Sequence, residues 1–162
     1  MNTERLKKAI RGQSHLMQAV NSFIYTHPEL AYEERVCSAY LCETLEKSGL
    51  VVERSIADVE TAFRATLTGD MDSPRVGLVV VYDAVPTIQP DGSYSPDHSC
   101  GHNVIAGAVV GVASALAKLT PRDGSMVVMG LPADEIGAPH SGCPDRCWAP
   151  EWLAVPYVSR SG

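Results

Sequence analysis

The chain has 162 residues, of which 45% are apolar, and a formal net charge of −6 at pH 7. Its length and composition are those of an ordinary globular protein with one core. The acidic balance argues against nucleic acid as a partner, because phosphate binding depends on concentrated Lys and Arg and the sequence has no basic cluster.

Nothing in the sequence is typical of a membrane or secreted protein. The charged amino terminus is followed by no secretory apolar core, and the longest apolar stretch, 104–116, is too short and too rich in Gly and Ala to cross a bilayer. The five cysteines are odd in number and irregularly spaced, which is poor evidence for a disulfide framework. We therefore expect a cytoplasmic protein with no membrane partner.

The first predicted elements are helices. Apolar residues recur at helical spacing from Thr3 to Tyr25, which predicts one amphipathic helix that ends before Pro28. A second helix is expected from about Glu33 to Lys47, with Gly49 as its C-terminal stop. Two of the cysteines fall in this helix and are expected to fill the core.

The next segments predict a sheet with a crossover helix. Residues 62–67 alternate apolar and polar side chains, which suits an outer strand with one face in water. The apolar runs 76–82 and 126–131 are typical of buried parallel strands. Between them, 87–99 has the composition of a loop, and 104–119 predicts an apolar helix whose glycines let neighbouring backbones approach closely.

Five polar residues lie at the ends of the elements of this β-α-β unit. Asp83 follows the first strand, Cys100 and His102 stand at the start of the helix, and Asp134 and Glu135 follow the second strand. A right-handed crossover places both strand ends and the helix start at one edge of the sheet, so we expect all five to converge. A thiolate, an imidazole and carboxylates are ligands suited to a zinc-like ion.

Four of these residues also have a simpler interpretation. Cys100 can be a buried thiol at a helix start, Asp134 and Glu135 a pair of carboxylates facing water, and Asp83 a cap of the loop that follows it. Cys100 can also be a nucleophile, because a helix amino terminus lowers a thiol pKa. That hypothesis is disfavoured because no third residue is evident to orient the imidazole of His102.

Two further groups of residues are expected to lie outside the site. His98 is interpreted as a loop histidine. Residues 137–162 show neither helical nor strand periodicity and are expected to form an irregular tail. Cys143 and Cys147 stand beside His140 in this tail, but a small zinc knuckle is disfavoured because the spacing is loose and no fourth ligand is evident.

Four motifs, in residues 27–34, 82–86, 98–103 and 130–135, together resemble the M20 family of metallopeptidases and amidohydrolases. The nearest branch is that of aminoacylase-like and aminobenzoyl-glutamate hydrolase-like enzymes. The resemblance covers residues 1–136 and implies the amino-terminal part of a zinc-peptidase-like catalytic domain. We thus expect an α/β fold of three layers, incomplete, with a mainly parallel sheet and helices on both faces. Residues 137–162 do not resemble the family's continuation, so this chain is expected to be a truncated member of the family.

The resemblance also implies roles for single residues. Cys100, His102 and Glu135 match metal ligands, Asp134 matches the general base that takes a proton from water, and Asp83 matches the aspartate that orients a metal ligand. Asp134 stands where family members usually carry glutamate, and its side chain is one methylene shorter, which alters the reach of the base. The implied cofactor is a divalent metal, with zinc expected first and manganese or cobalt as alternatives.

The implied reaction is hydrolysis of the amide bond of an N-acyl amino acid or small dipeptide, with the metal polarising the carbonyl and activating water. Full-length relatives are expected to be homodimers. Two other hypotheses stay open. One is a catalytically incomplete remnant that binds a metal or a partner, and the other is a thiol hydrolase that uses Cys100.

Overall fold

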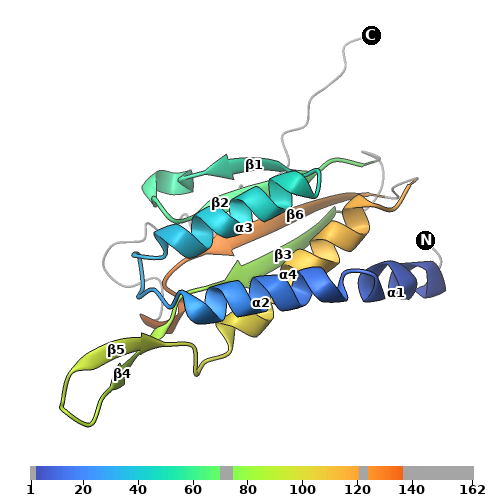
Figure 1. Ribbon diagram of the computed structural model, residues 1–162. Helices are drawn as coiled ribbons and strands as arrows, with labels where there is room; N and C mark the ends of the chain where they lie inside the picture. Colours follow the sequence, from blue (N-terminus) through green and yellow to red (C-terminus); the bar gives the residue numbers. More distant parts are fainter. Residues whose placement is uncertain (1–2, 70–74, 121–123, 137–162) are drawn as a thin grey trace.

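The computed structural model describes residues 3–69, 75–120 and 124–136, and in these a four-stranded sheet carries its helices on one face (Figure 1). The strands follow the order β1-β2-β6-β3 across the sheet. Their bounds are β1 Val51–Arg54, β2 Phe63–Leu67, β3 Arg75–Val81 and β6 Ser125–Leu131. Strands β6 and β3 pair in parallel, as expected for a crossover unit, and β3 lies at one end of this order.

The α/β class is confirmed, but the sheet is mixed and not mainly parallel. Strand β2 pairs antiparallel with both β1 and β6. The cause is local, because only a short connection with a 3-10 turn, η1 (Ile56–Asp58), joins β1 to β2 and reverses the chain. Strand β2 therefore lies inside the sheet and not at its outer edge, which β1 occupies.

The helices of the described residues share one core and so lie on one face of the sheet, where the sequence predicted both faces. Side chains of α2 (Ser14–Thr26), α3 (Arg35–Lys47) and α4 (His102–Ala117) pack in a single cluster with those of β2, β3 and β6. The opposite face of the sheet has a smaller apolar cluster around Met129. The pattern of β6 shows that it is buried on both faces but does not show what covers each face, and within the described residues no α-helix contributes to the Met129 cluster.

The single amino-terminal helix expected from the sequence is two helices. Helix α1 (Thr3–Arg11) ends at Gly12, and α2 begins at Ser14. The amide of Gln13 bonds back to the carbonyl of Ile10 in a tight turn, and glycine is a poor helix former. Helix α3 matches its prediction and is followed by Gly49 in the left-handed region, with a φ of 93°.

Helix α2 packs against α4 at two glycines of α4, which confirms that these glycines let a neighbouring backbone approach closely. A methyl group at Gly107 would lie 2.7 Å from the carbonyl oxygen of Met17, and one at Gly111 would lie 2.3 Å from the Cγ of the same residue. Such distances leave no room for a side chain at either position. The two helices therefore pack with their backbones close together, and most of the apolar surface of α4 is buried.

A two-stranded hairpin replaces the loop predicted at 87–99. Its strands are β4 (Val85–Ile88) and β5 (Tyr94–Asp97), and they extend beyond the end of β3 (Figure 1). Pro96 disguised the strand pattern, but proline is tolerated here because a two-stranded ribbon has only edge strands. Asp83 lies two residues before the start of this hairpin, and Cys100 lies three residues after its end.

In residues 3–69, 75–120 and 124–136, no helix has the length and apolarity needed to cross a membrane. The predicted irregular tail at 137–162, including the cysteines beside His140, lies outside the described residues.

Candidate metal centre

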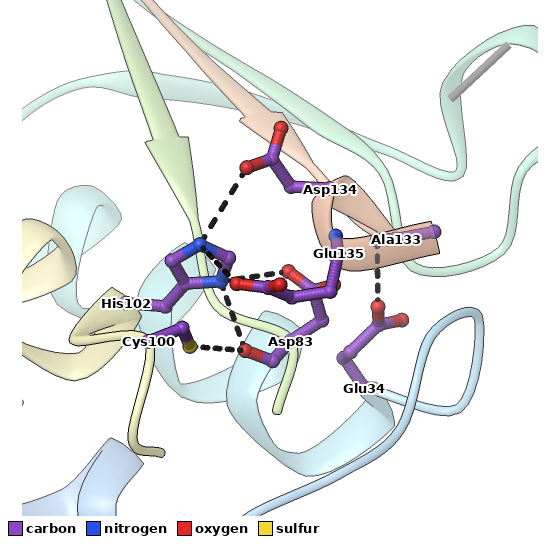
Figure 2. Close-up of polar contacts among 7 residues, drawn as sticks. All are labelled: Glu34, Asp83, Cys100, His102, Ala133, Asp134 and Glu135. Atoms are coloured by element: carbon purple, nitrogen blue, oxygen red, sulfur yellow. Dashed lines mark hydrogen bonds and ion pairs between the residues drawn. The ribbon is translucent and has the colours of Figure 1, made fainter. Parts of the chain in front are cut away.

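The five polar residues singled out in the sequence meet at the carboxyl edge of the sheet (Figure 2). Asp83 lies just beyond β3, and His102 is the first residue of α4. Asp134 and Glu135 lie in η2 (Asp134–Ile136), a 3-10 turn that follows β6. Cys100 is placed against them by Gly101, whose φ of 84° favours glycine and turns the chain into α4.

The orientation of His102 is fixed by Asp83. The Nδ1 atom of His102 lies 2.9 Å from the carbonyl oxygen of Asp83 and 2.9 Å from its Oδ1 atom. Both partners are acceptors, so Nδ1 carries the proton and donates, and in the neutral ring Nε2 is left with a free lone pair. The ring is buried, and Nε2 faces the two carboxylates beyond it.

Asp83 is fully buried and also holds the opposite side of the site. Its Oδ2 atom accepts a hydrogen bond of 2.9 Å from the backbone amide of Glu135. One carboxylate thus connects the helix start to the turn after β6. The bond from His102 Nδ1 to Asp83 Oδ1 corrects the sequence-based statement that no residue orients the imidazole of His102.

The side chains of Cys100, His102 and Glu135 each offer one ligand atom, and these atoms all lie within 4.8 Å of one another. The thiol of Cys100 donates to the carbonyl oxygen of Asp83, at 3.8 Å. Burial raises the pKa of the Cys100 thiol, and the hydrogen-bonded carboxylate of Glu135 raises it further. A nearby cation would favour the thiolate.

The outer part of the centre contains acceptors that face one another. The Nε2 atom of His102 lies 3.3 Å from Oε1 of Glu135 and 3.5 Å from Oδ2 of Asp134. Two carboxylates and an imidazole lone pair repel one another unless a proton or a metal ion lies between them. A sulfur, a nitrogen and an oxygen ligand form the donor set of a zinc site with one position open, so the residues fit a divalent metal.

The two carboxylates of η2 differ in their access to solvent. The side chain of Asp134 is 51% exposed, and that of Glu135 is 27% exposed. The preceding residue, Ala133, has a φ of 63°, a conformation that costs free energy for a residue with a Cβ atom. This turn directs Asp134 and Glu135 back towards His102.

The sequence analysis missed Glu34, which supports the same turn. Its side chain is fully buried. Its Oε1 atom accepts from the amide of Ala133 at 2.9 Å, and its Oε2 atom accepts from the hydroxyl of Thr61 at 3.1 Å. Burial raises the pKa of the Glu34 carboxyl, although these hydrogen bonds oppose the shift. The only signal in the sequence was its place in the 27–34 motif.

His98 is buried as well, although the sequence favoured an ordinary loop histidine. Neither of its ring nitrogens has a hydrogen-bond partner within the part of the chain that the structure describes. Burial lowers the pKa of His98, and the neighbouring ring of His102 lowers it further. His98 does not belong to the group of three ligand atoms.

Comparisons with known proteins relate the chain to hydrolases. No protein-family model matches the chain. The chain is 31% identical to human Xaa-Arg dipeptidase over 150 residues, a match that covers 82% of this chain and 33% of that protein. It is 29% identical over 127 residues to one of the subunits of p-aminobenzoyl-glutamate hydrolase from Escherichia coli (strain K12), covering 71% of this chain and 26% of that protein.

Two solved structures share the fold. A putative aminohydrolase from methicillin-resistant Staphylococcus aureus matches with a TM-score of 0.71 and 20% identity, covering 81% of this chain and 35% of that one. A dinuclear metal-binding peptidase of the M20 family from Bacillus subtilis matches with a TM-score of 0.66 and 24% identity, covering 81% and 37%. The chain belongs to the M20 family. This M20 chain spans between 26% and 33% of the length of these two curated relatives.

Proposed function

We propose that this M20 chain forms the metal-binding part of a hydrolase that cleaves the amide bond of an N-acyl amino acid or a small dipeptide. The observation that carries the proposal is the meeting of three ligand atoms, from Cys100, His102 and Glu135, within 4.8 Å. The names of the two relatives, a p-aminobenzoyl-glutamate hydrolase and an Xaa-Arg dipeptidase, support a small amide as the substrate.

The proposed metal is zinc, with manganese or cobalt as alternatives. The thiolate of Cys100, the Nε2 atom of His102 and the carboxylate of Glu135 would hold it. When bound, the ion would polarise the amide carbonyl and lower the pKa of water. Asp83 contributes by keeping the proton of His102 on Nδ1, so that Nε2 is free to bind.

Asp134 is the proposed general base. Its carboxylate lies beside His102 Nε2, half exposed, where an incoming water can reach it. A carboxylate at this place can take a proton from the attacking water and pass it to the leaving amine. Aspartate replaces the glutamate usual in the family, but its Oδ2 atom still comes nearly as close to His102 Nε2 as Glu135 Oε1 does, 3.5 Å against 3.3 Å.

The second candidate is a fragment that binds metal without catalysis. It is supported by the ligand group within the described residues, which has three members, a number that can hold an ion without catalysing hydrolysis. A thiol hydrolase is less well supported. The Cys100 thiol bonds to a backbone carbonyl and has a raised pKa, whereas a nucleophilic thiol needs a lowered pKa and a base beside it.

The test is hydrolysis of p-aminobenzoyl-glutamate, N-acetyl amino acids and arginine dipeptides, before and after treatment with a chelator. Activity that disappears with the chelator and returns with Zn²⁺, Mn²⁺ or Co²⁺ supports the proposal. Activity that survives the chelator but is lost on thiol alkylation favours the thiol hydrolase. Zinc binding without hydrolysis favours the fragment, and absence of zinc binding contradicts both metal hypotheses.

A further inference from the structure

We propose that the loop between α2 and α3, residues 27–34, positions the metal centre by holding both strand-end turns, with Glu34 as its principal positioning residue. The inference rests on the proposed function for its catalytic meaning, but the geometry that it describes can be tested without metal. No residue of this loop belongs to the group of three ligand residues, and Glu34 bonds to the backbone beside it, so its action is indirect.

The loop is bonded to both turns. The amide of Ala84, next to Asp83, donates to the carbonyl oxygen of Glu29 at 2.8 Å. The amide of Ala133, next to Asp134, donates to Oε1 of Glu34 at 2.9 Å. One short loop thus fixes the backbone beside a residue from each side of the centre.

The loop is itself held firmly by α3. The carboxylate of Glu29 accepts hydrogen bonds from the amides of Val36 at 3.0 Å and Cys37 at 2.8 Å, which have no acceptors within the first turn of a helix. The thiol of Cys37 donates to the carbonyl oxygen of His27 at 3.1 Å. These contacts anchor both the beginning and the middle of the loop.

The bond from Glu34 acts at the point where the site turn is strained. Ala133 is fully buried with a φ of 63°, and a non-glycine residue keeps such a backbone only when its surroundings hold it there. Glu34 supplies that support from a side chain fixed on its other oxygen by Thr61. Figure 2 shows Glu34 below Ala133, on the side of the turn away from His102.

A positioning role makes two predictions that a general packing role does not. Glu34→Gln keeps a carbonyl oxygen for the amide of Ala133 and should preserve most of the function that Glu34→Ala loses. Ala133→Gly removes the penalty of the positive φ. Combined with Glu34→Ala, it should restore part of what that variant loses, because the turn then keeps its shape with less support.

The experiment measures amide hydrogen exchange in the metal-free chain and Zn²⁺ affinity by calorimetry, with exposed Glu33→Ala as the matched control. We expect Glu34→Ala to speed exchange at the amides of Ala133 and Glu135 by about tenfold or more, and to weaken Zn²⁺ binding by about tenfold or more. Glu33→Ala should change neither, and Ala133→Gly should recover part of the affinity.

Unchanged exchange at both amides in Glu34→Ala, or equally faster exchange across the core strand β6, would overturn the positioning role. If the parent chain binds no Zn²⁺, the proposed function fails, while the exchange data still decide the inference. If Glu34→Ala does not fold, Thr61→Val decides, since it removes only the hydroxyl that fixes Oε2 of Glu34. Faster exchange at Ala133 in that variant supports the inference, and unchanged exchange contradicts it.

Discussion

The inner and outer parts of the centre use the same chemical group in opposite ways. In the inner part, the carboxylates of Asp83 and Glu34 are fully buried. Both oxygens of each carboxylate accept a hydrogen bond from another residue of the protein. In the outer part, the carboxylates of Asp134 and Glu135 are partly exposed and face the lone pair of His102. Satisfied carboxylates hold a backbone in place, whereas unsatisfied ones are available to a metal ion or a proton.

The largest effect expected in the outer part is on turnover. Asp134→Asn should lower the rate constant by about 100-fold to 10,000-fold, because an amide cannot accept the proton of water. Metal content should stay the same. The measurement is hydrolysis and metal analysis in this chain or, where the chain is inactive, at the matching position of a longer M20 relative. Loss of metal in this variant would mean that the two outer carboxylates have exchanged roles.

The inner part should respond in both metal binding and stability. Asp83→Asn removes one of the two side-chain acceptors, so that either Nδ1–H of His102 keeps only the backbone carbonyl or the amide of Glu135 loses its acceptor. We expect Zn²⁺ affinity to fall by about 10-fold to 100-fold and the metal-free free energy of unfolding to fall by about 1–3 kcal/mol. Calorimetry and urea unfolding measure these, with exposed Glu43→Gln as the control. If Asp83→Asn lost Zn²⁺ affinity but no free energy of unfolding, Asp83 would behave like the carboxylates of the outer part.

Glu135→Gln should weaken metal binding without changing stability. Its side chain accepts no hydrogen bond from a backbone donor in the described structure, so the metal-free chain should unfold at the same urea concentration as the parent. Zn²⁺ affinity should fall by about tenfold or more because a carboxylate ligand is lost. Equal Zn²⁺ affinity in variant and parent would remove Glu135 from the ligand set.

The smallest expected effect is a pH dependence of stability from Glu34. Burial raises the pKa of this carboxyl, so the folded chain binds its proton more tightly than the unfolded chain. Its contribution to the free energy of unfolding is therefore complete below the ordinary pKa of 4.5 and is lost as pH rises through the folded pKa. Glutamine does not titrate, so the stability of the parent relative to Glu34→Gln should fall as pH rises above 4.5.

Urea unfolding of both chains across this pH range is the measurement, with the exposed Glu33→Gln as the control for loss of one negative charge. A difference between parent and Glu34→Gln that does not change with pH would show that the hydrogen bonds of Glu34 cancel the effect of its burial on the pKa, and a difference that grows with pH would show that they outweigh it.

Local periodicity was sufficient to predict the β3-α4-β6 unit and the convergence of the residues at its ends. Apolar runs and the helix start are short-range features. The right-handed crossover then places both strand ends and the helix start at one edge of the sheet. The position of β2 inside the sheet was not predictable in this way, because strand order depends on contacts between distant segments. The β4-β5 hairpin was missed because Pro96 breaks the usual strand pattern.

The support of the centre was the least predictable part. Glu34 and Ala133 are 99 residues apart in sequence, and no local pattern pairs them. Asp83 was expected to orient a ligand only through the family resemblance. That it holds both His102 and the amide of Glu135 follows from where the strand ends meet in space.

The most direct test of the central claim is a Zn²⁺ titration of the chain and of three variants, followed by calorimetry. We expect the parent to bind the ion. Cys100→Ser and His102→Ala should each bind it at least about tenfold more weakly, because each removes a ligand atom. Cys42→Ala should match the parent, because Cys42 lies buried in the core, outside the ligand group. Equal affinities in all four chains would contradict the metal centre described here.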